Sequence, residues 1–130
     1  MIPTSTGAAR ALGEVLPELH GKLDGTPLRV RTPNVSAVDL TFEASNPVTV
    51  EDVNSVVEQA ANKDMVKVLA YDSEPKVSID FNHTTHSCIF APAQTKVVGK
   101  YTVRVLAWYD NEWAFSCRMA DVASTMGRLL

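Results

Sequence analysis

The chain has 130 residues, of which 45% are hydrophobic and 21% charged, and its formal net charge is -3. These values are typical of one globular domain with a hydrophobic core, and the absence of any basic run argues against nucleic-acid binding. No stretch approaches the roughly eighteen successive apolar residues of a membrane span, so we expect no membrane association. The two cysteines, Cys88 and Cys117, lie far apart, which favours a reducing, cytoplasmic location over a disulfide scaffold.

The first predicted element is a short helix over residues 6–16, with a hydroxyl at its N-terminal cap. Pro17 should end it, because the residue before a proline is displaced from helical geometry. Gly7 leaves backbone N–H groups open to an oxyanion, which the helix dipole would attract. The alternative is that Thr6 and Gly7 only cap the helix.

Residues 28–42 are predicted to form one long central strand, buried on one face and half covered on the other, with Pro33 at a bulge. Arg29 lies in an apolar frame near its start. Two interpretations remain open for Arg29: an outward-pointing residue of the strand, or a buried cation that pairs with an anion.

The rest of the chain alternates between helical and strand patterns. Thr49 and Asp52 form a capping-box pattern for a helix whose polar face includes Asn54, and this helix should cover a sheet. Asn111 is expected to cap a last, apolar helix. Strands are predicted over residues 66–71, 77–81, 87–90, 95–98 and 101–109. Short turns join them, so the fold class is α+β, with a mainly antiparallel or mixed sheet covered by helices.

Histidine and cysteine side chains cluster only weakly in this sequence. His83, His86, Cys88 and Cys117 match no standard spacing of zinc ligands. Neither cysteine follows a glycine-rich nucleophile turn or begins a helix, so no source of thiolate activation is visible. We therefore predict no metal site and no catalytic cysteine.

The polar junction Asp110-Asn111-Glu112 lies between the predicted last strand and the last helix. Ligands are commonly held at the ends of strands beside helix starts, and an asparagine carboxamide can pair with another amide. The alternative is that these residues only cap the helix.

Four motifs together resemble the glyceraldehyde-3-phosphate dehydrogenase family. They are Ile-Pro-Thr-Ser-Thr-Gly-Ala-Ala at residues 2–9, Leu-Pro-Glu-Leu with Gly-Lys-Leu in residues 16–23, Arg-Val with Thr-Pro-Asn-Val-Ser in residues 29–36, and Trp-Tyr-Asp-Asn-Glu-Trp at residues 108–113. Their order and their continuity from residue 2 to about residue 126 indicate the C-terminal, catalytic-domain portion of that enzyme. The resemblance implies that residues 1–130 form part of this domain.

The family oxidises an aldehyde phosphate to an acyl phosphate, with NAD, inorganic phosphate and a cysteine that forms a thioester. By this resemblance, Thr6 and Gly7 bind the attacking phosphate, and Arg29 lies between the sites for inorganic phosphate and for the phosphate of glyceraldehyde 3-phosphate. A planar guanidinium grips such oxyanions bidentately. Asn111 corresponds to the asparagine that pairs with the nicotinamide carboxamide. The family is cytoplasmic, glycolytic and tetrameric.

The sequence does not contain the family's NAD-binding domain, its Ser-Cys-Thr-Thr-Asn nucleophile motif, its catalytic histidine or the loop with the second phosphate-binding arginine. The resemblance therefore implies that the chain alone is inactive. It also implies that the chain self-associates as a homo-oligomer or pairs with the missing N-terminal part, because the last helix would lack its cover.

Four positions depart from the family's usual residues: Arg31, Ala114, Phe115 and Cys117. The family commonly has proline, glycine, tyrosine and asparagine at these positions. The four differences bear on the substrate preference more than on the fold. Two alternatives to the leading interpretation remain. One is a portion of the related erythrose-4-phosphate dehydrogenase, which typically lacks the motif at residues 6–9. The other is a non-catalytic interaction or assembly domain.

Overall fold

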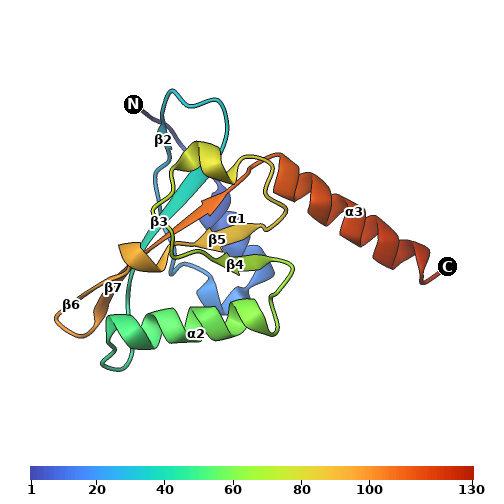
Figure 1. Ribbon diagram of the computed structural model, residues 1–130. Helices are drawn as coiled ribbons and strands as arrows, with labels where there is room; N and C mark the ends of the chain where they lie inside the picture. Colours follow the sequence, from blue (N-terminus) through green and yellow to red (C-terminus); the bar gives the residue numbers. More distant parts are fainter. The chain divides into compact units, whose positions relative to one another are not determined.

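The computed structural model describes the backbone of residues 1–130 and their side chains apart from that of Ala9. The chain forms two compact units, Met1–Pro33 and Asn34–Leu130, and each is described by itself (Figure 1). No helix in the described residues is long and apolar enough to cross a membrane.

The N-terminal unit contains a two-stranded ladder and one helix. Strand β1 (Ile2–Pro3) pairs antiparallel with β2 (Leu28–Arg29), and helix α1 (Ala8–Val15) lies between them in sequence. Helix α1 ends before Pro17, as predicted, and the 3₁₀ turn η1 (Pro17–Leu19) follows. Gly13 of α1 is buried beside this turn, where a Cβ atom would lie 3.1 Å from the Cα of His20.

The prediction of one long strand over residues 28–42 is wrong. The structure has β2 in the N-terminal unit and the separate strand β3 (Ser36–Glu43) in the C-terminal unit. Pro33 lacks a ladder N–H, and Val35 has a φ of 71°, a left-handed conformation that no extended strand accommodates. Most of β3 is exposed, so the predicted burial of one face is also not seen here.

The C-terminal unit is built on a five-stranded mixed sheet, which confirms the predicted fold class. The central strand β7 (Thr102–Tyr109) pairs antiparallel with β3 over the whole length of both, from Ser36 opposite Tyr109 to Glu43 opposite Thr102. Strands β5 (Cys88–Phe90) and β6 (Lys96–Val98) pair antiparallel with β7 at different points, and β4 (Leu69–Tyr71) pairs parallel with β5.

Two of the predicted strands differ from the observed elements. The prediction over residues 66–71 is correct only for β4, because turns occupy the residues before it. Residues 77–81 form the 3₁₀ helix η2 (Ser78–Phe81) instead of a strand. The Asp80 carboxylate accepts a hydrogen bond of 2.8 Å from the Val77 N–H, and this local bond closes a turn in place of a ladder.

Helix α2 (Val50–Asn62) begins at the predicted capping box. Thr49 Oγ1 accepts from the Asp52 N–H at 3.1 Å, and the Asp52 carboxylate accepts from the Thr49 N–H at 2.9 Å. Asn54 was expected on the solvent side, but it is half-buried, donates to the Pro92 carbonyl and accepts from the Thr95 hydroxyl at 2.7 Å. This polar residue therefore attaches α2 to the turn before β6.

The hydrophobic core of the C-terminal unit is small. Val35, Phe81 and Ile89 are buried together, with Ala70 and Trp108 packed against them. The rings of Phe81 and Trp108 stack with centroids 5.6 Å apart. The core therefore joins the residue before β3 to η2, β5 and β7, and it supports the end of β7 from which helix α3 (Trp113–Gly127) departs (Figure 1).

Candidate functional site

The start of α1 holds Thr6 and Gly7, the first two residues of the implied phosphate site. Both are exposed, and the Ala8 N–H donates to Thr6 Oγ1 at 3.2 Å, while no side chain caps the helix at Gly7. The first turn of α1 carries no acidic residue, and a Cβ atom at Gly7 would meet nothing within 4 Å. The helix start is therefore open and suited to an anion.

Arg29 lies beside the segment that leads into α1. It is opposite Ile2 in the β1–β2 ladder, and the Thr4 N–H extends the pairing by donating to the Pro27 carbonyl at 3.1 Å. Arg29 is exposed and forms no ion pair with any described side chain. The burial that the second interpretation requires is not seen in this chain, and the exposed guanidinium is available to an external anion.

The junction between β7 and α3 is organised by Asp110, whose residue is only 1% exposed. Its Oδ1 accepts from the Glu112 N–H at 2.9 Å and from the Trp113 N–H at 2.8 Å. Its Oδ2 accepts from the His83 N–H at 2.8 Å and from Asn34 Nδ2 at 2.9 Å. Asp110, and not Asn111 as predicted, therefore caps the start of α3.

The electrostatics of this junction favour the ionised carboxylate. Burial raises the pKa of Asp110, but the hydrogen bonds from the backbone N–H groups of Trp113, His83 and Glu112 and from the Asn34 amide outweigh it and lower the pKa to about 2. A negative charge is also favourable at the N-terminus of α3. The Asp110 side chain is thus ionised at neutral pH.

Asn111 lies between the capping residue and Glu112, inside the turn that Asp110 closes. It is exposed, and no hydrogen bond joins its carboxamide to another described side chain. A pocket of about 210 Å³ lies next to this turn, lined by Asn34, His83, Asp110, Glu112, Trp113 and Ser116. The Asn111 carboxamide is therefore free to pair with an external amide, and the capping alternative for this residue is excluded by the observed cap.

Three of the four positions that depart from the family pattern lie in α3. Ala114 is buried, so a small side chain suits its place in the helix, as expected. Phe115 is largely exposed, and Cys117 is a half-buried free thiol. Arg31, in the N-terminal unit, is exposed two residues after Arg29 and adds a second cation to that segment.

No cluster of three metal-ligating side chains exists among the described residues. Burial raises the pKa of the Cys88 thiol, which opposes thiolate formation. The His83 ring instead packs on the Trp113 ring, with centroids 4.6 Å apart.

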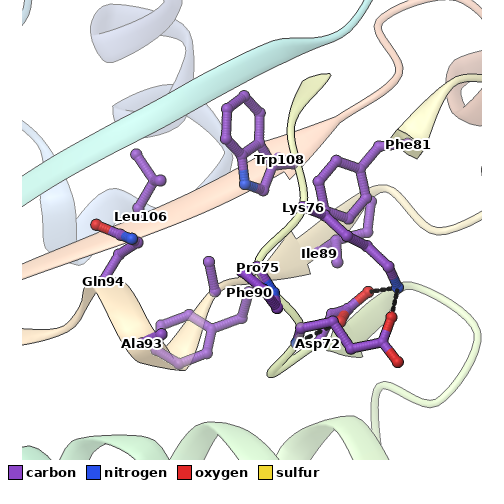
Figure 2. A pocket seen from close by; sticks show the side chains of 12 residues that line it. Asp72, Pro75, Lys76, Phe81, Ile89, Phe90, Ala93, Gln94, Leu106 and Trp108 are labelled. Carbon is purple, nitrogen blue, oxygen red and sulfur yellow. Dashed lines mark hydrogen bonds and ion pairs between the residues drawn. The ribbon is translucent and has the colours of Figure 1, made fainter. Parts of the chain in front are cut away.

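A second pocket, of about 100 Å³, lies against the sheet of the C-terminal unit, with Phe81, Ile89 and Trp108 among its apolar walls (Figure 2). At its edge the Lys76 ammonium contacts Asp72 at 2.6 Å and Glu74 at 2.9 Å. The hydrogen bonds to Asp72 and then Glu74 raise the pKa of Lys76, so this amine stays protonated and paired. The Lys76 ammonium is therefore not a free cation for this pocket.

The sequence predicts Thr6, Gly7, Arg29 and Asn111 as site residues and assigns the cap of the last helix to Asn111 and not to Asp110, and it gives Asn34 no role. The signal for Asp110 was present, because an aspartate three residues before the first apolar residue of a helix is a good N-terminal cap. No local signal indicated Asn34, which reaches Asp110 only through the tertiary fold. Thr6, Gly7 and Arg29 belong to one compact unit and Asn111 to the other.

Comparison with known proteins agrees with the resemblance found in the sequence. Residues 1–111 match the family model of the C-terminal domain of glyceraldehyde 3-phosphate dehydrogenase. Proteins named glyceraldehyde-3-phosphate dehydrogenase are 61% identical over 130 residues in Cereibacter sphaeroides, 55% over 129 residues in Xanthobacter flavus and 53% over 131 residues in Zymomonas mobilis. These alignments cover 99% to 100% of this chain but only 38% to 39% of each relative. The chain belongs to the glyceraldehyde-3-phosphate dehydrogenase family and matches its C-terminal domain.

Proposed function

We propose that this chain supplies the phosphate-binding and nicotinamide-contacting groups of an NAD-dependent, phosphorylating glyceraldehyde-3-phosphate dehydrogenase. In this role Thr6 and Gly7 bind inorganic phosphate, Arg29 binds the inorganic and substrate phosphates, and Asn111 pairs with the nicotinamide carboxamide. The names of the relatives support the reaction, and the family's cytoplasmic, glycolytic setting and tetrameric assembly belong to the same proposal.

The observation that carries the proposal is the pairing of Arg29 with the segment that enters α1. The β1–β2 ladder brings an unpaired guanidinium into the same small unit as an exposed hydroxyl and an open helix start. Guanidinium, hydroxyl and backbone N–H groups are the donors that bind phosphate oxygens. The absence of an acidic residue in the first turn of α1 leaves this positive potential uncompensated.

The catalytic nucleophile lies outside these 130 residues in this proposal, as does the NAD-binding domain. Cys88 is disfavoured as a nucleophile, because burial raises the pKa of its thiol. Residues 1–130 then act as part of a catalytic domain that contributes binding groups only, and NAD binds when the remaining part is present.

The test is a hybrid enzyme in which this chain replaces the matching 39% of the Cereibacter sphaeroides relative. The hybrid should reduce NAD in the presence of glyceraldehyde 3-phosphate and inorganic phosphate. Arg29→Ala should raise the KM for phosphate at least about tenfold, because each charge-assisted contact contributes on the order of 1.5 to 3 kcal/mol. Lys22→Ala, which removes an exposed cation of the same unit, is the matched control and should leave this KM within about twofold.

Two results would contradict the proposal. An unchanged KM for phosphate in Arg29→Ala would remove Arg29 from the anion site. Clear NADH production by the 130-residue chain alone would show that it contains its own nucleophile. Higher activity of the hybrid with erythrose 4-phosphate than with glyceraldehyde 3-phosphate would instead favour the related erythrose-4-phosphate dehydrogenase.

A non-catalytic assembly role is the second candidate, and one observation favours it. Phe115, Met119, Val122 and Met126 recur along one side of α3 and are 58% to 64% exposed. Such a continuous apolar stripe is unusual for a surface that faces only water, and it is typical of an interface.

A further inference from the structure

We propose that Asp110 is a positioning residue that holds the Asn111 carboxamide where it can pair with the carboxamide of the nicotinamide ring. This inference rests on the function proposed above for Asn111. In this inference the buried Asp110 carboxylate fixes the position of the Asn111 side chain and does not itself contact the cofactor.

The first step is local. Asp110 Oδ1 accepts from the N–H groups of Glu112 and Trp113, so the carboxylate spans the peptide segment that contains Asn111. The backbone that follows Asn111 is thereby fixed to the side chain of the residue that precedes it. An asparagine on an unclosed strand-to-helix loop would sample many orientations and lose affinity through ordering cost.

The second step attaches this turn to the body of the unit. Asp110 Oδ2 accepts from the His83 N–H and from Asn34 Nδ2, and Asn34 Nδ2 also donates to Asn82 Oδ1 at 2.8 Å. The packing of the His83 ring on Trp113 holds the same two segments together. The turn is therefore attached by hydrogen bonds to Asn34, the residue before the buried Val35, and to His83, in the segment after η2. These contacts add to the covalent connection of the turn to β7 and α3.

The third step explains why the residue is an aspartate. The Asp110 side chain accepts four hydrogen bonds and donates none. An ionised carboxylate is suited to this place because both of its oxygens accept. An asparagine of nearly the same shape has one accepting oxygen, and its NH₂ group would face two donors. Asp110→Asn therefore loosens the turn without changing the volume of the side chain.

The test uses the hybrid enzyme described above and two ligands, NAD and ADP-ribose, which lacks the nicotinamide ring. Asp110→Asn, Asn111→Ala and the double variant are compared by equilibrium binding. Asp121→Asn is the matched control, because Asp121 is a more exposed acid of α3 that pairs with Arg118 at 2.9 Å.

We expect Asp110→Asn to weaken NAD binding about tenfold and to leave ADP-ribose binding within about twofold. In the Asn111→Ala background, Asp110→Asn should add no further loss, because the two residues act through one contact. The control should bind both ligands as the parent does. The proposal is overturned if Asp110→Asn binds NAD with the parental affinity. It is also overturned if this variant loses the same factor of affinity for NAD and for ADP-ribose.

A different result distinguishes failure of the proposed function. If Asn111→Ala leaves the ratio of NAD to ADP-ribose affinity unchanged, the role of Asn111 is wrong and the inference falls with it. If Asn111→Ala is selective for NAD and Asp110→Asn is not, only the positioning role is overturned. Should Asp110→Asn fail to fold, Asn34→Ala removes one of the four contacts, and a selective loss of about threefold in NAD affinity is required.

Discussion

The side-chain amide of Asn34 donates a hydrogen bond of 2.9 Å to the carboxylate of Asp110, 76 positions further along the chain. Asn34 precedes Val35, a buried residue with φ of 71°, and Asp110 precedes the turn into α3. A strained, buried backbone segment and the start of a helix are thus held by one polar contact. The contact connects the small core of the C-terminal unit to the residue that we propose meets the cofactor.

Replacement of Asn34 by alanine should lower the free energy of unfolding by about 1 to 3 kcal/mol, because Asp110 Oδ2 loses one donor while it stays buried. Urea denaturation of the 130-residue chain, followed by the far-UV circular dichroism signal, measures the change. Asn46→Ala, in an exposed loop, is the control and should shift stability by less than about 0.5 kcal/mol. Equal stabilities of the two variants would contradict the structural role of Asn34.

The stability of the chain should depend on pH through Asp110. Its pKa is about 2 in the folded state against an ordinary value of 3.8, so the unfolded chain binds the proton more tightly. The resulting contribution of about 2 kcal/mol is fully present above the unfolded pKa and is lost as the pH falls from about 4 toward 2.

The comparison of parent and Asp110→Asn isolates this effect. Both proteins are unfolded in urea at pH 5, 4 and 3, and the slope of the unfolding free energy against pH is compared. The parent should show the steeper slope, since the variant cannot ionise at this position. Parallel curves would show that other carboxylates, such as Asp39 with its pKa lowered by the Arg104 hydrogen bonds, carry the acid sensitivity.

The contrast between Thr49 and Asn34 shows which contacts of this fold can be predicted from the sequence. The capping box at Thr49 and Asp52 was predicted correctly because the whole interaction lies within four residues. The roles of Asn34 and Asn54 were not predicted, because their partners lie far away in the sequence and become neighbours only after the sheet forms.

The error over residues 28–42 has a different physical origin. The alternating pattern after Val35 correctly indicated a strand, but periodicity does not show where one ladder stops and another begins. The sequence pattern places Pro33 at a bulge within one strand, whereas β2 already ends at Arg29 and the left-handed Val35 directly precedes β3. The candidate site residues came from family motifs, while their exposure and partners required the structure.

Gly13→Ala should destabilise the chain although alanine favours helices. An added Cβ atom would lie 3.1 Å from the His20 Cα and 3.3 Å from its Nδ1, and the backbone atom must shift to make room. We expect a net loss of up to about 2 kcal/mol, since overpacking costs on the order of 1 to 3 kcal/mol and the propensity gain is about 1 kcal/mol.

The control for Gly13 is Gly127→Ala, the last residue of α3, where a Cβ atom would meet nothing within 4 Å. That variant should be neutral or slightly stabilising. Thermal unfolding of both proteins, monitored by circular dichroism, provides the measurement. A stabilised Gly13→Ala would mean that the turn after α1 moves freely away from the helix.

Self-association through α3 is the last prediction. The apolar stripe of Phe115, Met119, Val122 and Met126 should cause the isolated chain to sediment as a dimer or larger species at high concentration, because contact between two such stripes removes apolar surface from water. Met119→Lys combined with Val122→Glu should shift the chain toward monomer, since both substitutions place charges in the middle of the stripe.

Ala120→Lys is the control: Ala120 is also exposed, but successive helical positions differ by about 100°, so it faces another side of α3. Sedimentation equilibrium over a hundredfold range of concentration distinguishes the outcomes. A parent chain that remains monomeric throughout would argue against assembly by this helix, and equal effects of the stripe and control substitutions would place the interface elsewhere.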